Sequence, residues 1–122
     1  MQMLSRNPAA AYRRVELDAR IEASSAADLT RICLEEAIAA LGQALLALDR
    51  MPGEIPREVL TRAQTIALWL ARSVAPEHPL RESLVTFYGG LAGQIGANFT
   101  RARPDEIARV RDDLKDLLVA AG

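Results

Sequence analysis

The sequence has few of the residue types that usually carry chemistry. Its 122 residues include one cysteine and one histidine. A lone Cys33 excludes an internal disulfide and suits a reducing compartment. His78 stands alone in a proline-flanked stretch, whereas a zinc site needs several His or Cys and a di-metal bundle site needs two Glu-x-x-His pairs. We therefore expect no metal and no cofactor.

The chain also lacks long apolar runs and an excess of either charge. In its middle, the longest unbroken apolar run covers residues 66–71, far short of the roughly 18 residues of a membrane span. Residues 1–14 contain no apolar signal core, so we expect the protein to remain in the cytoplasm. The formal net charge is −1, and no basic stripe is present to neutralise phosphates. A nucleic-acid partner is therefore not expected.

Aromatic residues make up only 4% of the chain, while half of it is hydrophobic. Alanine and leucine dominate, so the core must be aliphatic, and such a composition favours helix packed on helix. No segment has the pattern of a strand. The length fits one domain. We expect a single domain over residues 1–122, with residues 1–6 as a flexible tail.

Capping residues and prolines divide the chain into five helical segments. The expected segments cover about 7–23, from Asn7-Pro8; 24–49, from Ser24-Ser25; 56–75, from Pro56; 80–99; and a last one from Pro104. Short connections between long helices imply antiparallel neighbours. The predicted fold is therefore all-α: an antiparallel four-helix bundle with an additional short helical segment.

No constellation of residues predicts catalysis. Glu35 and Glu36 are adjacent, and adjacent helical residues do not face each other. The glycines at 89–96 lack the strand-turn-helix context of a phosphate loop. We interpret His78 as a solvated loop residue. The sequence therefore predicts no catalytic residue, and we expect that the protein is not an enzyme.

Two helices carry apolar side chains beyond what a simple bundle needs. The apolar residues of the second helix cover about half its circumference, wider than one core-facing stripe. Its candidate partner-binding residues are Leu34, Ile38, Leu41 and Leu45. The alternative is that this is a central helix touched by two neighbours. In the third helix, Leu68 projects among polar residues and is a further candidate, although single exposed leucines are common.

A stripe of glycines marks the fourth helix. Gly89, Gly93 and Gly96 are spaced i, i+4, i+7 and so share one face. A bare stripe lets another backbone approach closely, which makes these glycines candidate partner contacts. The alternative is a kinked or partly unwound segment, because each interior glycine costs about 1 kcal/mol relative to alanine.

The order and spacing of several short patterns resemble one known family. The patterns are Asn7-Pro8 followed by Tyr12, the apolar residues of 29–41, Leu60-x-x-Ala63-Gln64-x-Ile66-x-x-x-Leu70, Phe87-Tyr88 and Ala97-Asn98. From Asn7 to about Leu118 the chain resembles the flagellar secretion chaperones of the FliS type. Two departures are Ala26, where the family usually has proline, and the lack of a tryptophan near the end.

The resemblance implies a chaperone that binds the disordered C-terminal segment of flagellin, prevents premature polymerisation and keeps it ready for export. It implies a component of the flagellar export gate as a second partner. It also implies that the segment bearing Tyr12 covers part of the binding surface. We expect a monomer or weak dimer. The alternative is a self-associating structural or regulatory protein of flagellar assembly without flagellin cargo, because a helix-binding groove and a dimer seam have the same composition.

Overall fold

The computed structural model describes residues 26–121. Four helices follow one another along this range: α2 (Ala26–Arg50), α3 (Arg57–Ser73), α4 (Arg81–Ala97) and α5 (Pro104–Ala121). No strand occurs within the described range, and the predicted all-α fold is confirmed. The helix expected over 7–23 and the tail expected over 1–6 lie outside the described residues.

Prolines mark two of the helix starts, as predicted. Pro56 is the N-cap of α3, and Pro104 is the first residue of α5. Proline suits the start of a helix because the first N–H groups have no intrahelical acceptor. Just before α5, Arg103 Nη1 lies 2.9 Å from Glu106 Oε2. The carboxylate of Glu106 is also in the first turn of α5, where it interacts favourably with the positive helix end.

The ends of α3 and α4 come two residues earlier than the sequence predicted. Helix α3 stops at Ser73 because Val74 takes an extended conformation, with φ −66° and ψ 126°. Ala75, which precedes Pro76, is disfavoured from the helical region by the proline ring. Helix α4 stops at Ala97, where Asn98 acts as its C-cap.

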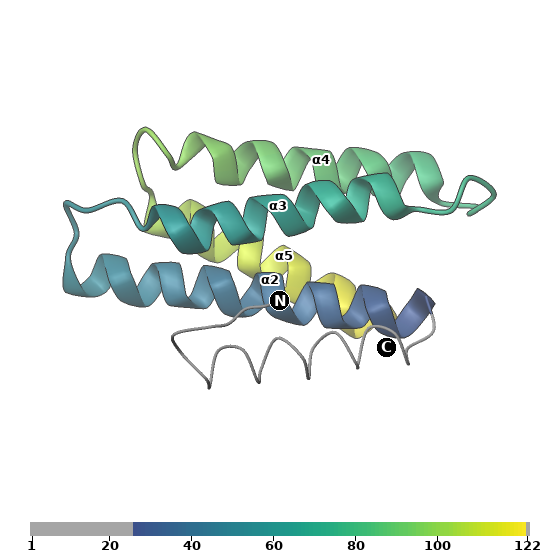
Figure 1. Ribbon diagram of the computed structural model, residues 1–122, viewed down its shortest axis with the longest axis horizontal. Coiled ribbons are helices and arrows are strands. Elements are labelled where there is room, and N and C mark those ends of the chain that lie inside the picture. The colour runs from purple at the N-terminus through teal and green to yellow at the C-terminus, as the bar shows by residue number, and fades with distance from the viewer. Residues whose placement is uncertain (1–25, 122) are drawn as a thin grey trace, which may run out of the picture.

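The described helices form an antiparallel bundle (Figure 1). Helix α2 packs against both α3 and α5, and α3 packs against α4, whereas α4 and α5 touch only lightly. The connections 51–56, 74–80 and 98–103 each reverse the chain. One end of the bundle therefore brings together the start of α2, the end of α3, the start of α4 and the end of α5 (Figure 1).

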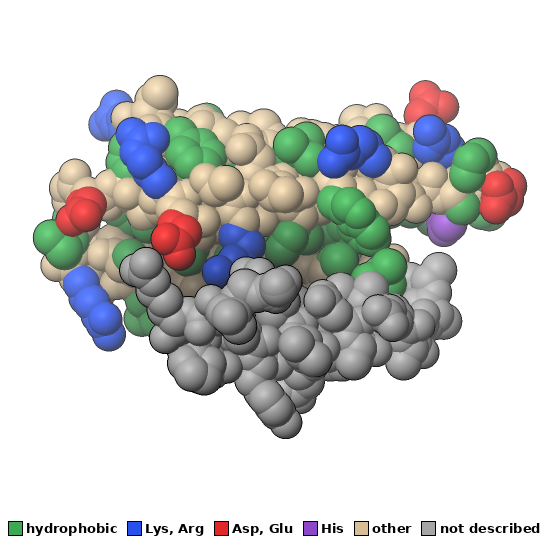
Figure 2. Space-filling model, viewed as in Figure 1, with side chains coloured by type: hydrophobic (Ala, Val, Ile, Leu, Met, Phe, Trp, Pro, Cys, Tyr) green, Lys and Arg blue, Asp and Glu red, His purple; other side chains and the backbone are tan. Residues whose placement is uncertain are grey.

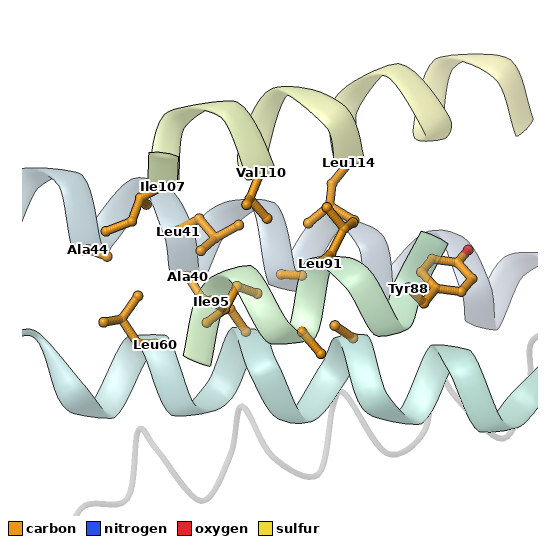
Figure 3. Packing of buried hydrophobic residues seen from close by; sticks show 14 of the residues in the cluster. Ala40, Leu41, Ala44, Leu60, Tyr88, Leu91, Ile95, Ile107, Val110 and Leu114 are labelled. Atoms are coloured by element: carbon orange, nitrogen blue, oxygen red, sulfur yellow. The ribbon is translucent and has the colours of Figure 1, made fainter. Parts of the chain in front are cut away.

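The core is aliphatic, as the scarcity of aromatic residues predicted. Buried leucine, isoleucine, valine and alanine side chains from all four described helices form one cluster. Figure 3 shows side chains of α2, α4 and α5 meeting along the bundle axis, with α3 contributing Leu60. Tyr88 is the one aromatic side chain among the buried core residues of this range. Its ring meets that of Phe87 edge-on, with 5.8 Å between centroids.

Helix α4 is unbroken from Arg81 to Ala97 despite its four glycines. No glycine in the described range has a positive φ, so the alternative of a partly unwound segment is wrong. Contacts with α3 compensate for the low helix propensity. Among them, the Gln64 side-chain amide donates a hydrogen bond to the Ala92 carbonyl at 3.2 Å. Tertiary packing of this kind commonly overrides intrinsic propensity.

Candidate partner-binding surface

Two of the candidate residues predicted on α2 belong to the core. Leu34 and Leu41 are each 0% exposed, so neither side chain presents accessible surface on the outside of the bundle, and that they contact a partner stays a prediction. The physical reason is that α2 touches both α3 and α5, and two core-facing stripes together produce its wide apolar arc. The alternative interpretation of α2 as a central helix is therefore the correct one.

The remaining predicted apolar candidates differ in accessibility. Ile38 and Leu45 are half-buried and pack against the core cluster, so each leaves only part of its side chain available. Leu68 is 46% exposed, in agreement with its predicted position on the polar face of α3. Tyr12 lies outside the described residues. Leu68 is thus the predicted apolar candidate with the most accessible surface among those described.

The glycine stripe lies mostly on open surface. Gly89 and Gly93 are exposed, and a Cβ added at either position would meet no described atom within 4 Å. Gly96 is half-buried, and a Cβ there would lie 2.8 Å from Gln64 Nε2. The packing of a partner backbone on this stripe stays a prediction.

Leu68 and the glycine stripe border the same side of the bundle. Gln64 contacts α4 at Ala92 and faces Gly96, and Leu68 follows Gln64 by one helical turn on the same side of α3. Because α3 and α4 run antiparallel, Leu68 lies beside an earlier turn of the stripe. The structure therefore brings together two candidates that are far apart in the sequence.

We expect Gly93→Ala to stabilise the free protein by about 1 kcal/mol, because alanine has the higher helix propensity and its methyl group has room. Urea unfolding measures this difference. Gly96→Ala is the matched control: its Cβ must displace the Gln64 side chain and disturb the hydrogen bond to Ala92, so its gain should be smaller or absent. Equal stabilisation by both substitutions would contradict the difference in surroundings.

A cavity of about 400 Å³ opens at the end of the bundle where α3 passes into α4. Its lining comes from all four described helices and from the α3–α4 connection. The lining residues are Thr30, Leu34, Leu70, Ser73, Val74, Ala75, His78, Leu84, Tyr88 and Leu117. Most of these side chains are apolar, while Ser73, Ala75 and His78 are exposed at its mouth. This volume lies within the range of typical ligand pockets.

The polar residues of the lining, Thr30, Ser73, His78 and Tyr88, can all donate hydrogen bonds, and two of them have defined surroundings. Tyr88 is only 4% exposed, and burial raises the pKa of its hydroxyl above the usual value because a phenolate would be poorly solvated there. The Tyr88 hydroxyl therefore keeps its proton. At the mouth, His78 Nδ1 accepts a hydrogen bond from the Leu80 N–H at 2.9 Å. In the neutral ring the proton must then be on Nε2, which becomes a donor.

The hollow surface continues from the cavity along α4. His78 also lines a second depression of about 510 Å³, together with Pro79, Arg81, Glu82, Val85 and Thr86. A third depression shares Pro79, Glu82 and Thr86 with the second one. The exposed Gly89 and Gly90 follow one turn later on α4. These hollows thus follow one another along α4 from the end cavity toward the glycine stripe, and we call the two depressions the α4 track.

Large apolar side chains are exposed on several sides of the described bundle. Besides Leu68, these are Leu46, Met51, Leu80 and Val119, each more than half exposed. Figure 2 shows hydrophobic side chains on one face, separated by individual charged groups rather than by one field of a single sign. Leu80 immediately precedes α4, and Val119 is near the end of α5. Exposed apolar surface is therefore not confined to one helix of the described bundle.

The lone cysteine has no features of an activated nucleophile. Burial raises the pKa of the Cys33 thiol, and the nearby Glu36 carboxylate raises it further. The thiol therefore stays protonated near neutral pH. In the part of the chain that the structure describes, no group of three or more His, Cys, Asp or Glu side chains could share a metal ion. None of the described helices is long and apolar enough to span a membrane.

Sequence reasoning missed the end cavity, and with it Tyr88 and His78 as site residues. In the sequence, Tyr88 stands out only as part of the Phe87-Tyr88 pattern, and His78 has the surroundings of a solvated loop residue. The signal that could have pointed to the cavity is the position of Tyr88 on the core face of α4, one turn after Leu84. Comparison of the sequence with protein-family models and with curated proteins gives no match.

Proposed function

We propose that this protein is a cytoplasmic flagellar export chaperone that binds the disordered C-terminal segment of flagellin. The observation that carries the proposal is the largely apolar cavity open at one end of the bundle. Natural cores are close-packed, so an open, largely apolar hollow of about 400 Å³, on a bundle that also exposes several large apolar side chains, suits a protein that buries this surface against a partner. The resemblance of the sequence to the flagellar secretion chaperones indicates flagellin as that partner.

The proposed mechanism needs only apolar surface and no reacting groups. A disordered segment that folds as an amphipathic helix can bury its apolar side chains in a groove. The free energy of that burial must exceed the cost of ordering the segment. While bound, the flagellin end is masked, so the subunit neither polymerises nor aggregates before export. Release then requires only dissociation, with a component of the export gate as the proposed second partner.

Isothermal titration calorimetry with flagellin from the same organism tests the proposal. We expect a 1:1 complex with full-length flagellin and no detectable binding when the C-terminal segment of flagellin is removed. Flagellin shortened by a similar length at its N-terminus is the matched control and should bind like the full-length protein. Equal affinity for the C-terminally shortened and full-length proteins would contradict the proposed mode.

Light scattering after size exclusion separates this function from self-association. The chaperone should be a monomer or weak dimer that becomes a 1:1 complex when flagellin is added. A tight homodimer whose mass is unchanged by flagellin would instead favour the alternative of a structural or regulatory protein that uses its apolar surface to bind a second copy.

A further inference from the structure

We infer that the end cavity binds the C-terminal turn of an amphipathic helix from a partner protein. This turn places a leucine-sized side chain in the cavity and a free main-chain carbonyl against the Tyr88 hydroxyl. This inference rests on the proposed function, since flagellin supplies the helix.

The Tyr88 hydroxyl lacks a hydrogen-bond partner within the described part of the chain, although the residue is only 4% exposed. Figure 3 shows the hydroxyl oxygen at the end of the ring that points away from the aliphatic side chains, toward the end of the bundle where the cavity opens. Buried polar groups in folded proteins are almost always hydrogen-bonded. The Tyr88 hydroxyl therefore needs a partner from outside the described chain, either a water molecule in the cavity or a polar group of a bound ligand that displaces the water.

The cavity suits a ligand that can accept hydrogen bonds. The buried polar residue of its lining is Tyr88, whose hydroxyl can donate, and His78 Nε2 is a second donor at the mouth. The Val74 carbonyl, an acceptor at the rim, is already approached by Arg81 Nη1 at 3.5 Å. The last four carbonyls of any helix have no intrahelical donor. The C-terminal end of a helix thus supplies a free carbonyl that can accept from the Tyr88 hydroxyl, together with an apolar side chain that can fill the cavity.

The adjoining surface favours a polypeptide over a small molecule. The cavity continues past His78 into the depressions along α4, which lead to the exposed Gly89 and Gly90. A small ligand would fill the cavity and leave the α4 track empty. A polypeptide anchored in the cavity could follow the α4 track and cover the glycine surface, where no side chain obstructs its backbone.

Two substitutions test the anchor by calorimetry with full-length flagellin. Tyr88→Phe removes only the hydroxyl and should weaken binding about three- to tenfold, the effect of one hydrogen bond. The melting temperature of the free protein should stay the same or rise, because an unpaired buried group is lost. A lower melting temperature with unchanged affinity would assign Tyr88 a merely structural role and overturn the inference.

The second substitution, Ala75→Phe, adds a bulky side chain at the exposed mouth of the cavity. It should weaken flagellin binding at least tenfold while the far-UV circular dichroism spectrum is unchanged. Thr61→Phe is the matched control, since Thr61 is exposed on α3 and does not line the cavity. It should bind like the wild type. If the wild type, Tyr88→Phe and Ala75→Phe all bind flagellin equally, the anchor site is wrong while the proposed function stands.

If the wild type does not bind flagellin at all, the proposed function is refuted. The end cavity can then still be tested with a small molecule. Isovaleramide combines a leucine-like isobutyl group with one amide carbonyl. In an NMR titration it should shift the methyl resonances of Leu34, Leu84 and Leu117, and Ala75→Phe should abolish those shifts. Such a result would support the cavity as a site for this chemistry and reject flagellin as its source. An absence of shifts in the wild type would overturn the inference.

Discussion

Leu41→Ala is expected to lower the free energy of unfolding by about 2–5 kcal/mol, the usual cost of truncating a fully buried leucine. Leu41 is 0% exposed, and Figure 3 shows it beside Val110 of α5 and Ile95 of α4. The substitution removes the apolar atoms that join these helices and leaves a cavity between them. Because domains of this size are stable by roughly 5–15 kcal/mol in total, the loss is a large fraction of the stability.

Leu46→Ala on the same helix is the matched control for Leu41→Ala. Leu46 is 60% exposed, so the same chemical change should alter the free energy of unfolding by no more than about 0.5 kcal/mol. Urea unfolding followed by circular dichroism measures both variants. A cost below about 1 kcal/mol for Leu41→Ala would contradict its place in the core. At temperatures where Leu41→Ala remains folded, its affinity for flagellin should match that of the wild type.

The contrast between Leu41 and Leu46 shows where sequence reasoning stops. Periodicity predicted the helices, and the prolines at 56 and 104 predicted two of their starts. The same periodicity could not decide which leucines of α2 are accessible. An apolar arc widened by a second neighbouring helix looks the same in sequence as one widened by an exposed docking face. The contacts of α2 with both α3 and α5 decide in favour of the first.

The end cavity could not be predicted from the sequence, for a different reason. Its lining residues extend from Thr30 to Leu117 and follow no common period. They meet only because four helices end or begin at one end of the bundle, and because α5 touches α4 only lightly. Leu68 and the glycine stripe were predictable one helix at a time. Their position beside each other depends on the antiparallel pairing of α3 with α4, which Gln64 shows through its contacts.

Asn98 shows how a polar residue can be as important to the fold as the apolar core. It was visible in the sequence only as part of the Ala97-Asn98 pattern, yet its side chain is 1% exposed. Its Nδ2 donates to the Gln94 carbonyl at 2.8 Å, and its Oδ1 accepts from the Arg103 N–H at 2.6 Å. The first bond closes the last turn of α4, and the second fixes the chain where it enters α5. One amide therefore links the end of α4 to the residue before α5, two helices that otherwise touch only lightly.

Asn98→Ala should accordingly lower the free energy of unfolding by about 2–4 kcal/mol, because two hydrogen bonds are lost and the Arg103 N–H and Gln94 carbonyl lose a partner. Thr100→Ala, in the same connection, is the control. Its hydroxyl contacts the Ala97 carbonyl at 3.2 Å but is exposed, so water can replace this contact and the loss of stability should stay near 0.5 kcal/mol.

Asn98→Asp separates the two hydrogen bonds, since a carboxylate still accepts from the Arg103 N–H but cannot donate to the Gln94 carbonyl. Its cost should equal or exceed that of Asn98→Ala near neutral pH, because the new charge is buried, and should fall as the carboxyl becomes protonated in acid. Urea unfolding of the three variants between pH 4 and 7 measures these differences, and an Asn98→Ala protein as stable as Thr100→Ala would show that the amide does not hold α4 and α5 together.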